Sequence, residues 1–366
     1  MIGKGKDGEP IAADVAIIGA GIIGLSCAWE LARRGVTVSI YDKDDPTRGA
    51  SWAAAGMIAP GYEAASEDDA HPFLLELCLA SAKLWPGFAN DLEDASGIEV
   101  GFHPGPTIAV STNPGQTRRL EKIRTSLGKR GIDCSAPPLD ELRELEPLLS
   151  GGVQAGLVIP TDGRVNNRLV LEALASACKK AGVVFHREHV PGIAGTSRAS
   201  LPNAPLILWA GGFADSASPE ALPALEAMYG VRGEMIAFDH KDIAIHHVIR
   251  CGKEYAVPRN GQTLIGATTK EEADPQSYLK AAATMFLQGV DNASIIDSWG
   301  GCRPATPDHA PLLGKVATST FAATGHYRNG ILLAPITAQI MADMILDNKV
   351  SELAAAFSPD RFATVS

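Results

Sequence analysis

Cysteine is scarce in this chain and is nowhere spaced for metal binding. The six cysteines are scattered over 366 residues without a C-x-x-C pair, so neither a disulfide framework nor a zinc site is expected, and a reducing compartment is favoured. No run of about 18 apolar residues occurs, and the start, MIGKGKDGEP, lacks the hydrophobic core of a secretion signal. We therefore expect a cytoplasmic protein with no metal and no membrane segment.

Basic residues are also fewer than acidic ones. Lysine and arginine number 32 against 42 acidic residues, which gives a formal net charge of −10. Such a surface argues against a nucleic-acid groove or an anionic membrane as the partner. The hydrophobic content of 46% and charged content of 20% suit a soluble globular enzyme, and the length predicts about two domains.

The most informative stretch is residues 14–42, DVAIIGAGIIGLSCAWELARRGVTVSIYD. A short β-branched run at 15–18 predicts a strand, the apolar spacing that follows predicts a helix, and residues 36–41 predict a second strand. Between the first strand and the helix stands G-x-G-x-x-G, and Asp42 ends the second strand 23 positions after Gly19. A dinucleotide fingerprint expects an acid about 20 residues on.

Each part of this motif has a physical role. Gly19 permits the sharp turn, Gly21 lets the backbone approach a pyrophosphate, and Gly24 lets the helix lie close to the strands. The helix start offers unpaired N–H groups and a positive dipole end to phosphate, and Asp42 can accept a hydrogen bond from a ribose hydroxyl. The motif predicts dinucleotide binding, whereas a βαβ unit without ligand leaves the acid unexplained.

Later segments predict a second kind of sheet. Residues 230–268 alternate apolar and polar, with a hairpin signal at Asn260-Gly261, which indicates antiparallel strands. We expect a helix near 275–290, a strand near 294–299 and a turn-rich passage over 300–314. The predicted fold is α/β with two discontinuous domains. The Rossmann-like nucleotide domain is expected to comprise 1–96, 164–229 and 311–366, and the antiparallel substrate domain 97–163 and 230–310.

Four motifs then resemble a known family. They are the G-x-G-x-x-G unit, ASWAAAGMIAP (50–60), YAVPRNGQTLIGAT (255–268), and the pair WGGCRPATPD (299–308) and GHYRNGILLAP (325–335). In this order they are similar to the flavin-dependent amine oxidases of the D-amino-acid oxidase class, and within that class to the glycine oxidases of thiamine biosynthesis. The resemblance spans nearly the whole chain.

The resemblance implies FAD rather than NAD as the cofactor. It places the pyrophosphate turn at Ile22 and Ile23, the adenosine ribose at Asp42 and Lys43, and the adenine near the backbone of Val190. The cofactor residues that it implies are Gly19, Gly21, Ile22, Ile23, Gly24, Asp42, Lys43, Ala50, Ser51, Ala55, Gly56, Met57, Val190, His326, Tyr327, Arg328, Asn329, Gly330, Ile331 and Leu332. The last seven would surround the isoalloxazine ring, at the start of the final helix.

The resemblance also implies an α-amino carboxylate substrate. Arg303 would bind the carboxylate as a bidentate fork, Tyr255 would offer its hydroxyl, and Arg328 would reach the same end of the flavin. The implied reaction oxidises glycine or a similar small amino acid to an imine, with dioxygen reduced to hydrogen peroxide, in the thiazole branch of thiamine biosynthesis. Relatives form homotetramers, so a homo-oligomer is expected.

Two other readings remain open at this stage. The same fold could serve a flavin-dependent dehydrogenase of D-amino-acid, proline or sarcosine type that uses an acceptor other than oxygen. A nicotinamide-dependent dehydrogenase or a non-catalytic nucleotide-binding module is the third possibility, against which the GHYRNGILLAP motif speaks.

Three positions depart from the family pattern. VNNR (165–168) replaces a more usual Asp-Pro pair before the arginine, and Thr269 stands where some relatives have methionine near the substrate. Cys302 precedes the substrate arginine, at about the place where a cysteine of related sarcosine oxidases bonds to flavin. We expect non-covalent FAD, with a link through Cys302 as the alternative. A loop over 60–72 is a candidate cover for the pocket.

Overall fold

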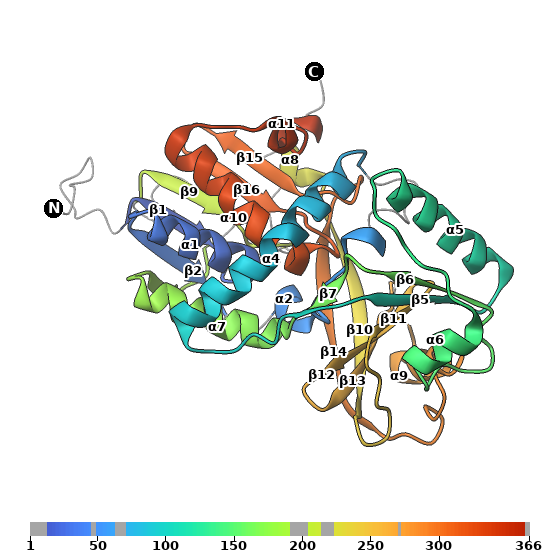
Figure 1. Cartoon of the computed structure of the whole chain (residues 1–366). Helices are drawn as coiled ribbons and strands as arrows, with labels where there is room; N and C mark the ends of the chain where they lie inside the picture. The colour runs from blue at the N-terminus through green and yellow to red at the C-terminus, as the bar shows by residue number, and fades with distance from the viewer. Residues whose placement is uncertain are drawn as a thin grey trace.

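The computed structural model describes residues 13–44, 49–62, 71–190, 204–213, 223–269 and 272–362. Within them the chain builds two large sheets and one small one, which Figure 1 shows with their helices. The mixed α/β class predicted from the sequence is confirmed. Most of the 60–72 loop, over 63–70, lies outside the described residues.

The first sheet has six strands in the order β15-β16-β9-β1-β2-β8. Its central strands are parallel, and only the β15–β16 pair at one edge is antiparallel. Four-residue β1 is buried throughout, as expected for a parallel strand covered on both faces. The strands are β1 (Val15–Ile18), β2 (Val38–Asp42), β8 (Val184–Arg187), β9 (Leu206–Trp209), β15 (Leu312–Ala317) and β16 (Thr320–Thr324).

Four helices form a layer on this sheet. Helix α10 (Gly330–Asp347) packs against α1 (Ile22–Arg33) and α4 (Leu74–Ser96), and α7 (Asn167–Lys180) packs against both α1 and α4. Two buried side chains of α4 fix the first turn of α10: Ser81 Oγ and Trp85 Nε1 donate to the carbonyl of Leu332 at 2.6 and 2.9 Å. By length and composition alone α10 could cross a membrane, but 67% of it is buried inside the fold, as a core helix requires.

The second sheet has seven strands in the order β14-β10-β13-β12-β11-β5-β6. All neighbours are antiparallel except β11 and β5. Helix α9 (Pro275–Thr284) covers one face and buries Leu279 and Ala283 against it. The strands are β5 (Thr107–Ser111), β6 (Ala155–Ile159), β10 (Tyr229–Asp239), β11 (Val248–Cys251), β12 (Glu254–Arg259), β13 (Gln262–Gly266) and β14 (Ile295–Ala305).

A three-stranded sheet, β3-β7-β4, completes the strands of the described chain. Its members are β3 (Met57–Ile58), β4 (His103–Pro104) and β7 (Gly163–Arg164). The remaining helices are α2 (Ala50–Ala53), α5 (Pro114–Gly128), α6 (Leu139–Leu145), α8 (Pro223–Glu226), α11 (Glu352–Ala355) and the 3-10 helix η3 (Pro359–Phe362).

The strands divide between the sheets along the predicted segment boundaries. The six-stranded sheet takes its strands from 15–42, 184–209 and 312–324, and the seven-stranded sheet takes its strands from 107–159 and 229–305. Figure 1 shows the two sheets in different halves of the molecule. The assignment of a domain to each sheet stays a prediction.

The prediction of a turn-rich passage over 300–314 is wrong for its first six residues, which belong to β14, and for its last three, which belong to β15. Strand β14 continues to Ala305 and pairs with β10 along its whole length. Gly300 and Gly301 allow neighbouring side chains to pack closely against the strand. A Cβ on Gly300 would meet the Glu234 carboxylate, and one on Gly301 would meet Ala53. Glycine in a strand interior marks such crowding as well as a turn, and the sequence alone does not separate the two.

Replacing Ser81 with alanine tests the contact between α4 and α10. We expect Ser81→Ala to lower the free energy of unfolding by about 1–2 kcal/mol, because the buried carbonyl of Leu332 loses one of its two side-chain donors. Chemical denaturation monitored by circular dichroism measures the change. The control is Ser294→Ala at an exposed site, where a change below about 0.5 kcal/mol is expected. Equal losses in both variants would contradict the role given to Ser81.

Candidate active site

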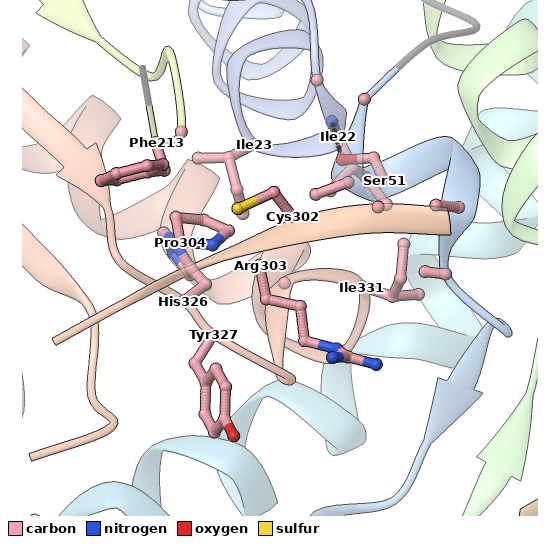
Figure 2. A pocket seen from close by; sticks show the side chains of 18 of the residues that line it. Ile22, Ile23, Ser51, Phe213, Cys302, Arg303, Pro304, His326, Tyr327 and Ile331 are labelled. Carbon is pink, nitrogen blue, oxygen red and sulfur yellow. Dashed lines mark hydrogen bonds between the residues drawn. The ribbon is translucent and has the colours of Figure 1, made fainter. Parts of the chain in front are cut away.

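A cavity of about 390 Å³ lies where the glycine turn after β1, the start of α10 and the end of β14 meet. Figure 2 shows side chains from these elements around it. The structure brings together eighteen of the twenty-two residues predicted to bind cofactor or substrate. Those that line the cavity are Gly19, Gly21, Ile22, Ile23, Asp42, Lys43, Ala50, Ser51, Ala55, Gly56, Met57, Tyr255, Arg303, His326, Tyr327, Arg328, Gly330 and Ile331.

Four predicted cofactor residues do not line this cavity in the described chain. Gly24 lies beneath the glycine turn, and Val190 packs in a small cluster with Tyr41 and Trp209. Asn329 is buried at the N-terminus of α10, and Leu332 belongs to the core between the helices. A cofactor contact through any of these four stays a prediction.

The glycine turn holds backbone donors at the cavity wall. Gly19 has a φ of +107°, which favours glycine. The amide of Ala20 donates to Asp42 Oδ2 at 2.6 Å, and the amide of Ile22 donates to Ser51 Oγ at 3.1 Å. Helix α1 has no side-chain cap at Gly21, so the amides that follow Ile22 in its first turn and its positive dipole end are available to an anion.

The Ser51 segment is held in place by Asn167. Its Nδ2 donates to the carbonyls of Ser51 and Trp52 at 2.8 and 3.0 Å. The neighbouring Asn166 caps α7 through its side-chain oxygen, which accepts from the amides of Arg168 and Leu169. The two asparagines of VNNR thus have distinct structural roles. Sequence analysis noted this motif as a departure but could not find Ser51 and Trp52 as partners of Asn167, since they lie more than 100 positions away.

The loop before α10 contributes a buried neutral histidine. His326 is 3% exposed and its Nε2 lies 3.0 Å from Thr337 Oγ1. Burial lowers the pKa of His326 to about 3, so the imidazole is uncharged at neutral pH. The next residue, Tyr327, has a φ of +48° and donates its amide to the carbonyl of Pro304 at 2.8 Å. This contact ties the α10 loop to the end of β14.

The seven-stranded sheet supplies the far end of the cavity. Arg303, on β14, donates from Nη1 to the carbonyl of Thr268 at 3.3 Å, and a Cβ on Gly233 would collide with its guanidinium. Glycine at 233 therefore lets the arginine lie flat along β10. In the described part of the chain no carboxylate pairs with Arg303. Tyr255, on β12, is 9% exposed and donates its hydroxyl to Met235 Sδ at 3.2 Å.

Two further predicted residues occupy the same end. The guanidinium of Arg328 lies 5.0 Å from the ring centre of Tyr327. Thr269, which stands where some relatives have methionine, also lines the cavity. Sequence reasoning did not single out Phe213, Met235 and Lys253, which line the cavity too, because a phenylalanine, a methionine and a turn lysine carry no chemical signature of their own.

Cys302 lies beside the arginine but faces a different region. Figure 2 shows the sulfur of Cys302 directed toward Ile23 and Pro304, whereas Arg303 extends from the other side of β14. Adjacent residues of a strand alternate in this way. The thiol therefore faces the nucleotide side of the cavity, away from the guanidinium.

The parallel sheet, its glycine turn and the acid after β2 are those of a dinucleotide-binding protein. The cavity runs from this turn to a second sheet that presents an arginine and a tyrosine, as expected for an oxidoreductase with a separate substrate wall. The chain belongs to the FAD dependent oxidoreductase family, whose model matches residues 14–344. This confirms the D-amino-acid oxidase class expected from the sequence motifs.

The relatives include glycine oxidases and longer, bifunctional proteins. The chain is 33% identical to the bifunctional protein ThiO/ThiG of Synechocystis sp. over 97% of its own length, and it spans only 55% of that protein. It is 30% identical to the glycine oxidase of Geobacillus kaustophilus, with 95% of this chain and 97% of the relative aligned. The crystal structure of glycine oxidase from that organism superposes with a TM-score of 0.86 and covers 95% of this chain and 98% of that one. An iminodiacetate oxidase from Chelativorans sp., 20% identical with a TM-score of 0.80, shares the fold.

The residues present fit FAD, the cofactor that defines this family. The cavity joins an uncapped helix N-terminus with a ribose-type acid, and its wall between them includes the small residues at 49–51 and 53–56. Small side chains let backbone approach a flat ring. At the other end α10 begins at Gly330, also without a side-chain cap, so a second positive dipole end lies beside the cavity.

A single methyl group at Gly24 tests whether the glycine turn holds the cofactor. The Cβ of Gly24→Ala would overlap the carbonyl oxygen of Gly19 and displace α1 from the turn. We expect purified Gly24→Ala to contain less than about half the FAD of the wild type and to lose about 1–3 kcal/mol of stability. FAD is measured by its absorbance after denaturation.

Gly87→Ala is the matched control, since it adds a methyl group to an exposed helical glycine with open space around it. Wild-type FAD content and a stability gain of up to about 1 kcal/mol are expected for this variant. Full FAD content in Gly24→Ala would contradict the tight contact.

The neutral state of His326 predicts a pH dependence of stability. Its folded-state pKa of about 3 lies below the ordinary value of 6.5, so the unfolded chain takes up a proton first as pH falls. The stability from His326 is complete above pH 6.5 and is lost between about 6.5 and 3, at up to about 1.4 kcal/mol per pH unit. Urea unfolding of wild type and His326→Gln from pH 7 to pH 4 measures the difference. A difference that stays constant over this range would show that His326 titrates normally.

Proposed function

We propose that this protein is a glycine oxidase, which converts glycine and similar small amino acids to the imine and then to the 2-oxo acid and ammonia, with release of hydrogen peroxide. One observation carries the proposal. Arg303 lines the same cavity as the glycine turn, and in the described chain it has no carboxylate partner. A guanidinium held in this way is suited to bind a substrate carboxylate in a bidentate fork. Near-complete alignment with named glycine oxidases supports it.

The chain would hold FAD with both of its uncapped helix starts. The amides of the glycine turn and the N-terminus of α1 would bind the pyrophosphate, and Asp42 would accept from the adenosine ribose. The N-terminus of α10 would stabilise negative charge on the reduced ring. FAD supplies the two-electron oxidation of the amine and passes the electrons to dioxygen.

The protein residues would act by orientation and electrostatics. Arg303 would fix the carboxylate, and the Tyr255 hydroxyl lies on an adjacent wall with only a weak thioether acceptor, Met235 Sδ, to exchange for the substrate. Arg328 would add positive charge at the same end. His326 is bonded to Thr337 and stays neutral, so we assign it no proton transfer. Holding the reacting carbon in one position is itself a large catalytic effect.

The wider setting belongs to the same proposal. The imine of glycine is a suitable precursor for the thiazole branch of thiamine biosynthesis, and the ThiO/ThiG relatives support that placement. We further propose a cytoplasmic homotetramer with non-covalent FAD. The domain division proposed is 1–96, 164–229 and 311–366 for FAD, and 97–163 and 230–310 for the substrate, which follows the division of strands between the two sheets.

A visible spectrum of the purified protein tests the function directly. A flavin band near ~450 nm should bleach when glycine is added without air and return when air is admitted. Hydrogen peroxide should appear in proportion to the glycine consumed. A band that bleaches but returns slowly in air would instead indicate the amino-acid dehydrogenase. A band that does not bleach with glycine, sarcosine, D-alanine or D-proline would refute the proposal.

Arg303→Lys tests the carboxylate fork. Lysine keeps the charge but offers only a point contact, so we expect kcat/KM for glycine to fall by at least about 100-fold, equivalent to about 2.7 kcal/mol. FAD content should be unchanged. Oxygen uptake gives the rates, and Arg118→Lys at an exposed site on α5 is the control. Wild-type kcat/KM in Arg303→Lys would remove this residue from substrate binding.

A further inference from the structure

A second cavity, of about 330 Å³, lies beside the small sheet. Met57 on β3 lines the active-site cavity, whereas His103 on β4 and Arg164 on β7 line the second one. The opposite wall is the end of β12, which contributes Arg259, and the turn that follows it at Asn260 and Gly261. Nothing in the proposed oxidation of glycine uses this cavity.

The second cavity is cationic. The charged or titratable residues that line it are His103, Arg164, His240 and Arg259, and no aspartate or glutamate does so in the described chain. Arg259 is only 7% exposed. Among the described residues neither arginine has an ion-pair partner. Such burial of an arginine disfavours its charged form unless an anion is close.

The pKa values of both arginines are lowered, as expected where no anion compensates their charge. Burial lowers the pKa of Arg164, and burial together with the charge of Arg168 lowers the pKa of Arg259 to about 10. Asp297 opposes this effect at Arg259, but its side chain is exposed. The pKa of His103 is also lowered, first by burial and then by the charges of Arg164 and His247. The cavity thus gathers positive charge that its own walls do not neutralise.

A chain of hydrogen bonds connects this cavity with the cofactor site. Arg259 Nη1 donates to Asn167 Oδ1 at 3.2 Å, and Asn167 Nδ2 donates to the carbonyl of Ser51 at 2.8 Å. Ser51 Oγ in turn accepts from the amide of Ile22, at the glycine turn. An anion that orders Arg259 would therefore also order the segment beneath the proposed pyrophosphate position.

We propose that the second cavity binds a small anion with a phosphate group, and that the bound anion slows release of FAD. Two guanidinium groups match the charge of about −2 and the three acceptor oxygens of a phosphate. The coupling follows because the anion and the Ser51 segment use the same Arg259–Asn167 contact, and coupling between two binding sites is reciprocal. The proposal concerns FAD and the chain alone, so it does not depend on which amine is oxidised.

Calorimetric titration of the FAD-loaded protein with inorganic pyrophosphate tests the site. FAD fills the nucleotide part of the active-site cavity, and loss of binding in the variants below assigns the remaining signal to the second cavity. We expect one saturable site per chain, whose affinity for pyrophosphate falls at least tenfold in Arg164→Gln. His103→Gln, at an exposed position, is the second cavity variant. Lys241→Gln is the control: its side chain is 85% exposed, it pairs with Asp239 and it does not line the cavity.

Three outcomes would overturn the site. They are no saturable binding at millimolar pyrophosphate, equal weakening in Lys241→Gln, and wild-type affinity in both cavity variants. Citrate that binds more tightly than pyrophosphate would overturn the choice of phosphate.

For the coupling, the rate at which FAD dissociates into dilute buffer should fall at least threefold with saturating pyrophosphate in wild type and not in Arg164→Gln. An unchanged rate in wild type would overturn the coupling.

Discussion

The close contact between Gly24 and the carbonyl of Gly19 is the constraint on which the rest of the structure depends. Only a residue without a Cβ allows α1 to start directly against the turn after β1. That position directs the first amides of α1 into the cavity and lets α10 pack on α1. The start of α10 is held by Ser81 and Trp85 from α4, which gives the cavity its second helix N-terminus.

The second sheet reaches the same cavity because β14 is long. Its eleven residues begin at Ile295, away from the nucleotide half, and end at Ala305, where the amide of Tyr327 bonds to the carbonyl of Pro304. Arg303 is thereby placed opposite the glycine turn. The absence of side chains at Gly300, Gly301 and Gly233 permits the crowding of Glu234, Ala53 and the guanidinium around this strand.

Much of the candidate site could be predicted because its motifs are local. The spacing of Gly19, Gly21 and Gly24 before Asp42 specifies a βαβ turn within 24 residues, and most of the residues inferred from the family motifs line one cavity. Other features depended on contacts between distant segments. The glycines of β14 read as turn residues until their neighbours Glu234 and Ala53 were known, and Asn167 had no visible partner until α7 was placed beside Ser51.

The sequence by itself determined the fold class, the family and the cofactor chemistry, because a glycine turn, a terminal acid and a family-specific arginine are properties of short segments. Only the tertiary structure decided which charges are left without partners. Arg164 and Arg259 lie 95 positions apart in the chain, and nothing in their flanking residues predicts that they share a cavity. Their separation from carboxylates is a property of the residues that line this shared cavity, since the energy of a charge depends on everything near it in space.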